Sequence, residues 1–267
     1  MKFTWFDTYI NGKYFKQASI LLSIIIDKKK YYLQLDTGTK TSIIYGKFLE
    51  NKNISFKTTE PTPILFTLNS IVSTHYFRVD TETELTEFKG IPMIGLLGLD
   101  FIKQGGILSI DFPNQRISFS ENFFSKIKLS FLTIPIKSQE GFLVFTSIIN
   151  KKEYVFMWDS GASIIDLFIT SELWEKLTLT SIHSKSNQIV SLSGAFGSTH
   201  MLFKEKINYP FLLFGKQMKN KNAYCNKFYS PLTDIAKVGI DGLIGNTLFI
   251  KKIISIDFNT NEMCYSK

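Results

Sequence analysis

Two stretches decide the fold of this chain: YYLQLDTG at residues 31–38 and YVFMWDSG at residues 154–161. Each is an apolar, strand-like run that ends in Asp-Thr-Gly or Asp-Ser-Gly. A second short apolar run follows each copy, at residues 42–44 and 163–165. One turn of this composition is common and would indicate little. Two copies in matching contexts indicate a pair of carboxyl groups, each held in a glycine turn at the end of a strand.

Further landmarks recur in the same order in the two halves of the chain. They are IGLLGLDFI at 94–102 and GILSIDF at 106–112 after the first copy, GLIGNTLFI at 242–250 and IISIDF at 253–258 after the second, and Ser-Thr-His at 73–75 and 198–200. An ordered set of repeats predicts two related lobes. We place the N-terminal lobe at residues 1–122 and the C-terminal lobe at 123–267, because the apolar pattern is interrupted between residues 120 and 130.

Composition and periodicity predict strands rather than helices. The chain has 267 residues, 44% of them hydrophobic, with 25 Phe and 11 Tyr, which suits a packed β protein. Apolar runs predict strands at residues 19–26, 31–36, 63–67, 91–97, 107–112, 131–136, 143–149 and 153–158. The helix candidates are short. They are residues 171–177 behind a Thr170 cap, and the segments after Gly98 and Gly245. The sequence therefore predicts an all-β protein.

The two halves together resemble the aspartic peptidases, the pepsin-like and retropepsin-like group. The signature is a hydrophobic-hydrophobic-Asp-Thr/Ser-Gly turn followed later by hydrophobic-hydrophobic-Gly, here Leu96-Leu97-Gly98 and Leu243-Ile244-Gly245. The resemblance covers nearly the whole chain and implies a bilobal pepsin-like (acid protease) fold, with two related β-barrel-like lobes and a cleft between them. It also implies a sheet shared by both lobes, to which residues 3–6 are expected to contribute.

The resemblance implies an aspartic endopeptidase with Asp36 and Asp159 as its catalytic pair. Two like charges at hydrogen-bond distance cannot both ionise easily, so the pair is expected to share one proton; aspartic proteases are the usual example of this effect. The ionised partner acts as general base on a water, which attacks the peptide carbonyl. This chemistry requires no cofactor and no metal.

The neighbours of the two aspartates have expected supporting roles. Gly38 and Gly161 let the backbone approach the carboxylates, and Thr37 and Ser160 anchor the two turns to each other by hydroxyl hydrogen bonds. The third residue after each Asp differs, since Thr39 keeps a hydroxyl and Ala162 does not. A missing donor disfavours the ionised carboxylate, so we expect a working range closer to mild acidity or neutrality than that of pepsin.

Two hairpins are candidates for flaps that close over a substrate. The first places Leu68, Asn69 and Ser70 at its turn, and the second places Ser193, Gly194 and Ala195 there. The first lacks the tyrosine that pepsin-like enzymes usually carry at this tip, so the pair suits a more symmetric, retropepsin-like cleft. The alternative is that both are ordinary surface hairpins.

The positive charge does not indicate a nucleic-acid partner. The formal net charge is +8, but Arg78 and Arg116 are the only arginines, and phosphate and base recognition favour the arginine fork. We expect a polypeptide substrate and a monomer. No stable membrane insertion is expected, because the apolar run at residues 20–26 is too short to span a bilayer. The start of the chain has no recognisable secretory leader, so at face value we expect a protein inside the cell, or a secreted or periplasmic one if a leader was removed.

The cysteines and histidines offer no competing site. Cys225 and Cys264 form a disulfide or remain as buried thiols, and their spacing with the three histidines does not match a zinc site. His75 and His200, in the repeated Ser-Thr-His, are expected to pack or to form hydrogen bonds within hairpin strands. The remaining alternative function is a catalytically silent bilobal protein- or peptide-binding module of the same fold, although such relatives typically damage one of the two turns.

Overall fold

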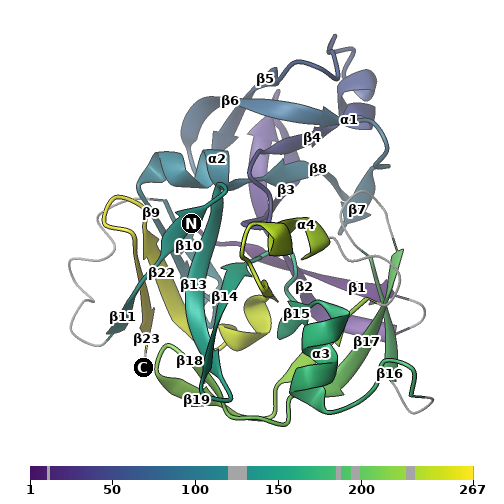
Figure 1. The fold of residues 1–267 in the computed structure, drawn as a ribbon. Coiled ribbons are helices and arrows are strands. Elements are labelled where there is room, and N and C mark those ends of the chain that lie inside the picture. The colour runs from purple at the N-terminus through teal and green to yellow at the C-terminus, as the bar shows by residue number, and fades with distance from the viewer. Residues whose placement is uncertain (11–12, 120–130, 185–187, 194–198, 227–231, 267) are drawn as a thin grey trace.

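A computed structural model describes residues 1–10, 13–119, 131–184, 188–193, 199–226 and 232–266. The described strands form three sheets, and the described helices are short (Figure 1). This confirms the prediction of an all-β fold. The predicted lobe boundary at residues 120–130 lies outside the described residues, so the division at residue 122 stays a prediction.

The first sheet has eight strands, all from the first half of the chain, and follows the order β1-β2-β3-β8-β4-β6-β5 with β7 paired to β8. Its strands are β1 (Thr4–Ile10), β2 (Lys13–Ile26), β3 (Lys29–Leu35), β4 (Ile43–Tyr45), β5 (Thr62–Leu68), β6 (Ile71–Asp80), β7 (Thr86–Phe88) and β8 (Ile91–Leu97). Side chains of β5 alternate between buried and exposed, as expected for a strand with one face on a core.

The second sheet has ten strands from the second half, in the order β16-β17-β20-β15-β21-β14-β13-β18-β19, with β12 paired to β13. Its strands are β12 (Lys137–Gln139), β13 (Phe142–Ile149), β14 (Lys152–Trp158), β15 (Leu167–Ile169), β16 (Gln188–Ser193), β17 (Thr199–Lys206), β18 (Phe211–Leu213), β19 (Lys216–Met218), β20 (Asn222–Cys225) and β21 (Gly242–Ile244). The first two sheets therefore divide the chain as its internal repeat does.

The third sheet joins the two halves. Its order is β10-β9-β22-β23-β11, from β9 (Ile107–Asp111), β10 (Arg116–Ser118), β11 (Phe131–Pro135), β22 (Ile253–Asp257) and β23 (Glu262–Ser266). The two closing strands meet at its centre, where Ser109 pairs with Ser255 and their hydroxyls lie 2.5 Å apart. The N-terminal segment lies elsewhere than expected. Strand β1 pairs with β2 in the first sheet, and only residues 1–3 meet the shared sheet, where Lys2 bridges to Arg116 and the amide of Phe3 donates to the carbonyl of Gln115.

The described helices are short, and those after Thr170, Gly98 and Gly245 occupy predicted places. They are α1 (Gly46–Asn51), α2 (Leu99–Ile102), the 3-10 turn η1 (Lys103–Gly105), α3 (Ser171–Thr178), α4 (Leu232–Lys237) and the 3-10 turn η5 (Asn246–Leu248). Thr170 caps α3 as predicted, because its hydroxyl accepts a hydrogen bond from the amide of Leu173 at 3.4 Å. Helix α4 was not predicted. None of the described helices is long and apolar enough to cross a membrane.

One continuous hydrophobic core runs through both halves. In the first half the rings of Trp5 and Phe112 stack at 6.0 Å, and in the second half those of Trp158 and Phe249 meet edge to face at 6.0 Å. Full burial of a large apolar side chain contributes about 1.5–3 kcal/mol, so the shared core stabilises the two halves together. Cys225 and Cys264 are free and buried.

Candidate active site

The two Asp-Thr/Ser-Gly turns are positioned by the same crossing of strands in each half. Strand β3 runs parallel to β8, so Leu35 lies beside Leu97, and the chain returns antiparallel along the other edge of β8 as β4. The second half repeats this with β14 and β15 on either side of β21. The amides of Asp36 and Asp159 donate to the carbonyls of Leu97 and Ile244 at 3.0 and 2.9 Å. Each aspartate thus begins a loop that crosses the end of a central strand.

Close packing explains why glycine ends each hydrophobic-hydrophobic-Gly segment. A Cβ added at Gly245 would lie 2.0 Å from the carbonyl oxygen of Ala162, and one at Gly98 would lie 2.7 Å from the carbonyl carbon of Thr41. The loop that follows each aspartate therefore passes directly over this glycine, and a side chain there would displace the loop.

Two hydroxyl side chains join the turns across the halves. The hydroxyl of Thr37 donates to the carbonyl of Trp158 at 2.8 Å and accepts from the amide of Ser160 at 2.9 Å. Reciprocally, the hydroxyl of Ser160 donates to the carbonyl of Leu35 at 2.9 Å and accepts from the amide of Thr37 at 2.9 Å. All four bonds are buried, and they have the cross-lobe arrangement that the resemblance implies for these residues.

The two carboxyl groups face one another across this junction. A Cβ added at Gly38 would lie 2.5 Å from Cγ of Asp159, and one at Gly161 would lie 2.6 Å from Oδ2 of Asp36. Each glycine therefore leaves room for the carboxylate of the opposite turn. Asp36 is buried and Asp159 is half-buried, and their carboxyl groups share a hydrogen bond.

Burial dominates the electrostatics of the pair. It raises the pKa of Asp36 well above its ordinary value, the negative charge of Asp159 raises it further, and the amides of Gly38 and Thr39 partly oppose this. Burial also raises the pKa of Asp159. The amides of Gly161 and Ala162, 2.8 and 3.2 Å from its Oδ1, and the hydrogen bond from Asp36 favour its ionised form. Because burial raises the pKa of both carboxyl groups, the pair is suited to holding one shared proton.

The hydroxyl of Thr39 does not support Asp36 as expected. It donates to the carbonyl of Thr41 at 3.0 Å, because the loop folds back at that point, and the carboxylate receives the amide of Thr39 instead. The asymmetry between Thr39 and Ala162 therefore does not act through the hydroxyl. The pKa of both aspartates is raised chiefly by burial.

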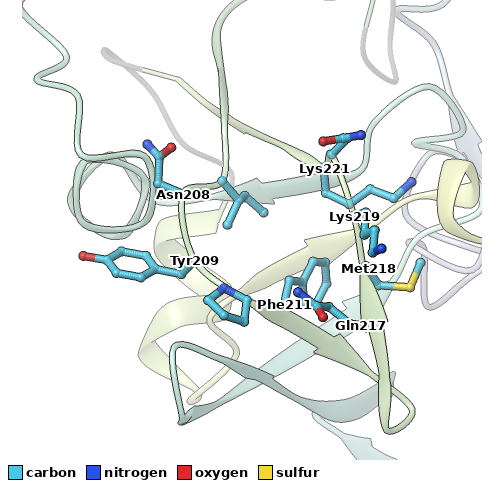
Figure 2. Close-up of a pocket in the computed structure, with 10 residues that line it drawn as sticks. Asn208, Tyr209, Phe211, Gln217, Met218, Lys219 and Lys221 are labelled. Atoms are coloured by element: carbon cyan, nitrogen blue, oxygen red, sulfur yellow. The ribbon is translucent and has the colours of Figure 1, made fainter.

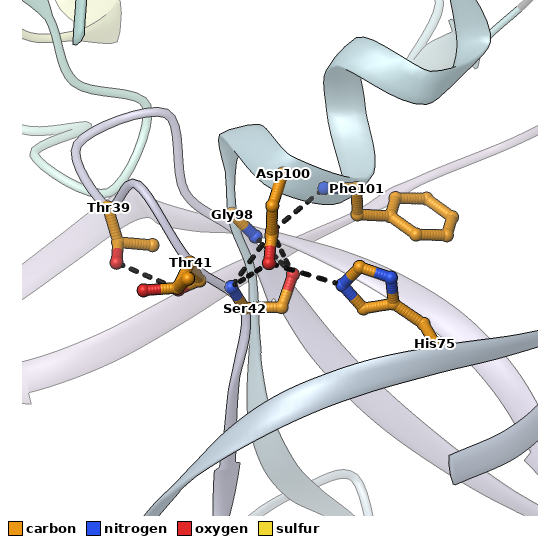
Figure 3. A network of polar contacts seen from close by, with 7 residues as sticks. All are labelled: Thr39, Thr41, Ser42, His75, Gly98, Asp100 and Phe101. Atoms are coloured by element: carbon orange, nitrogen blue, oxygen red, sulfur yellow. Dashed lines mark hydrogen bonds and ion pairs between the residues drawn. The ribbon is translucent and has the colours of Figure 1, made fainter. Parts of the chain in front are cut away.

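The loops are tied down by residues that the sequence alone did not single out. After the first turn, Asp100 accepts from the amide and hydroxyl of Ser42, and the amide of Gly98 donates to that hydroxyl (Figure 3). After the second, the side-chain Nδ2 of Asn246 donates to the carbonyl of Ser160 and to the hydroxyl of Ser163. The repeated closing blocks contain both Asp100 and Asn246, which was the available signal.

Tyr45 is a further residue near the pair that the sequence did not indicate. It ends β4 and is buried, and burial together with the charges of Asp80 and Asp36 raises its pKa to about 12. Its phenol therefore stays neutral across the working range of a carboxyl pair.

The flap candidates lie in different surroundings. Leu68 ends β5, where it packs into the core, while Asn69 and Ser70 form an exposed turn with φ of 51° and 68°, typical of a tight β-hairpin. Ser193 ends β16, and Gly194 and Ala195 lie outside the described residues. A role of these six residues in substrate binding stays a prediction.

A pocket of about 360 Å³ lies away from the aspartates. It is lined by residues 207–211, which lead into β18, and by residues 217–221, in β19 and the chain after it (Figure 2). The ionisable side chains that line this pocket are Tyr209, Lys219 and Lys221. Its lining contains no carboxylate that could act as a base. We therefore assign the candidate active site to the paired aspartates.

Comparison with known proteins supports the architecture. No family model and no curated protein match the chain. Among solved structures it is similar to the aspartic proteinase from Irpex lacteus, with a TM-score of 0.53 and 12% sequence identity over 94% of each chain. At this identity the likeness shows the fold alone. The protein has the two-lobed, all-β fold of the pepsin-like proteinases.

Proposed function

We propose that the protein is an aspartic-type endopeptidase, which hydrolyses peptide bonds with a water activated between Asp36 and Asp159. The observation that carries the proposal is the reciprocal approach of the two turns, in which each glycine makes room for the opposite carboxyl group. A single titratable pair, raised in pKa and joined by a hydrogen bond, is suited to general acid–base chemistry.

In this proposal the two aspartates divide the work. Asp159, whose charge is stabilised by two backbone amides, takes a proton from the attacking water. Asp36, which holds the shared proton, donates a hydrogen bond to the developing oxyanion, and a proton then passes to the leaving nitrogen. The water oxygen forms the new bond to the carbonyl carbon, and the C–N bond breaks.

The substrate is a polypeptide that lies between the lobes. Because one chain supplies both carboxyl groups, the proposed chemistry needs no second copy of the protein. The proposed lobes, residues 1–122 and 123–267, each contribute one aspartate and one hydroxyl of the junction.

Cleavage of an unfolded protein and a mixed peptide library over a range of pH tests the proposal. The wild type is compared with Asp36→Asn and Asp159→Asn, with and without pepstatin. We expect cleavage by the wild type alone, inhibited by pepstatin, and a loss on the order of 10³-fold or more in either variant. Equal behaviour of all three preparations would exclude a peptidase. Peptide binding without cleavage would favour the silent binding module.

A further inference from the structure

A buried histidine contacts the residue that ties down the first catalytic loop. His75 lies on β6 and is 5% exposed. Its Nε2 makes no hydrogen bond, but it lies 3.4 Å from Oδ2 of Asp100, within ion-pair distance. The rings of Phe77 and Phe101 meet the imidazole edge to face at 5.0 and 5.2 Å. Asp100 is therefore the charged group against which this imidazole is placed.

Asp100 in turn holds the loop that begins at Asp36. The amide of Ser42 lies 2.9 and 3.0 Å from its two carboxylate oxygens, and the hydroxyl of Ser42 donates to Oδ1 at 2.7 Å. The backbone amides of Leu99 and Asp100 donate to the carbonyls of Thr39 and Lys40 at 3.0 and 3.1 Å. Figure 3 shows this path from imidazole to carboxylate to loop.

The second loop is tied down by different chemistry. The neutral side chain of Asn246 donates from Nδ2 to the carbonyl of Ser160 and to the hydroxyl of Ser163. The hydroxyl of Thr247 donates to Asp166 at 2.8 Å. Asp166 pairs with Lys221 at 3.2 Å, and an ordinary lysine keeps its charge throughout the neutral range. Among the described side chains, only the first loop is therefore tied through a histidine.

We propose that His75 and Asp100 form a positioning couple, in which the charge on His75 sets how firmly the loop of residues 39–42, and with it Asp36, is held. This inference rests on the proposed function. A protonated His75 makes a charge-assisted contact with Asp100, which is about twice as strong as a neutral one. Loss of its proton weakens the contact and loosens the loop of the first turn. Histidine is the side chain whose charge ordinarily changes between about pH 5 and 8.

The charges around the couple are consistent with an ionised Asp100. Partial burial opposes ionisation, but the contact with His75 and the hydrogen bonds from Ser42 lower the pKa of Asp100 below its ordinary value. The groups that face His75 from its own strand and from α2 are otherwise aromatic, and its ion pair within the described residues is with Asp100 alone. The charge on His75 is thus transmitted to one carboxylate.

Two variants distinguish the effect of the charges on His75 and Asp100 from a general effect on the fold. Asp100→Asn keeps the shape and an acceptor for Ser42 but removes the charge, and His75→Gln keeps a polar side chain that does not titrate. His183→Gln, at an exposed histidine, is the matched control. The readouts are the pH dependence of kcat and KM on a fluorogenic peptide, and the NMR shifts of the Gly38 and Thr39 amides followed against the His75 ring signals.

In the wild type we expect the signals of the two amides to shift with pH at the same midpoint as the His75 ring signals. Across that midpoint kcat should fall on the order of tenfold while KM changes little, because small displacements of a catalytic group have effects of this size. Both variants should lose the shared midpoint and this step in kcat, whereas His183→Gln should retain both. The proposal would be overturned if the midpoint of the amide shifts differed from that of the His75 ring, or if both variants kept the wild-type pH profile of kcat. Because the amide shifts do not require turnover, a protein without peptidase activity would refute the proposed function while the couple is still tested.

Discussion

At the scale of single residues, Asp36 and Asp159 are held where a charge is costly. Burial and mutual repulsion raise the pKa of Asp36 well above the ordinary 3.8, so the folded protein binds this proton more tightly than the unfolded chain does. The contribution of Asp36 to stability is therefore complete below about pH 3.8 and is lost as the pH rises through the raised value. The folded protein is therefore more stable at a pH where Asp36 is protonated than at one where it is ionised.

We expect Asp36→Asn to stabilise the protein at neutral pH, because an amide has no charge to bury. The free energy of unfolding at pH 7 should rise by about 1–2 kcal/mol, an increase in Tm of about 2–4 °C per kcal/mol for a chain of this size. The gain should vanish near pH 3, where the wild-type carboxyl is protonated. Asp159→Asn should change in the same direction.

Thermal unfolding at several pH values between 3 and 8 checks this prediction. Asp234→Asn, at an exposed aspartate on α4, is the control and should follow the wild type. A variant at Asp36 that is less stable than the wild type at pH 7 would show that the carboxylate is not destabilising there.

At the scale of elements, the ends of β3 and β14 are joined by two hydroxyls. Thr37→Val removes one donor and one acceptor, and leaves the amide of Ser160 and the carbonyl of Trp158 unpaired and buried. We expect a loss of about 2–4 kcal/mol, since each unpaired buried group costs about 1–3 kcal/mol. Ser160→Ala should have a similar effect, because it leaves the amide of Thr37 and the carbonyl of Leu35 without partners.

Denaturant unfolding measures these losses, and a double-mutant cycle tests their coupling. The double variant should lose less than the sum of the single losses, because the four bonds act as one unit. Thr39→Val, whose hydroxyl bonds only the nearby carbonyl of Thr41, is the control and should lose about 0.5 kcal/mol or less. Strictly additive losses would show that the two hydroxyls act independently.

Elements with a strong apolar pattern are predictable from the sequence. All eight predicted strand segments fall on observed strands, and the Thr170 cap is present. Helix α4 was missed because its six residues are too few for a helical period to emerge. The hairpin of β18 and β19 was missed because two strands of three residues give almost no alternation.

At the scale of the whole molecule, the shared sheet makes each half incomplete by itself. Strand β9 from the first half has β22 from the second as its neighbour across Ser109 and Ser255. A fragment of residues 1–122 would expose this edge together with its part of the common core. We therefore expect the intact chain to unfold in a single cooperative transition, despite its two lobes.

Fragments 1–122 and 123–267, produced separately and then mixed, test this expectation. Each alone should show little protection of amide hydrogens, and the mixture should regain protection in β9 and β22. Stable, protected structure in fragment 1–122 alone would mean that the lobe folds independently of the shared sheet.

The sequence by itself determined the local parts of the site: two strands that each end in Asp-Thr/Ser-Gly, two closing glycines, and an all-β architecture. These follow from apolar periodicity and turn chemistry, which act over a few residues. Only the tertiary structure decided that Asp36 and Asp159 face each other and that His75 contacts Asp100. The physical reason is that burial and charge–charge distance depend on segments far apart in the sequence, which meet only when the strands cross and the two halves pack together.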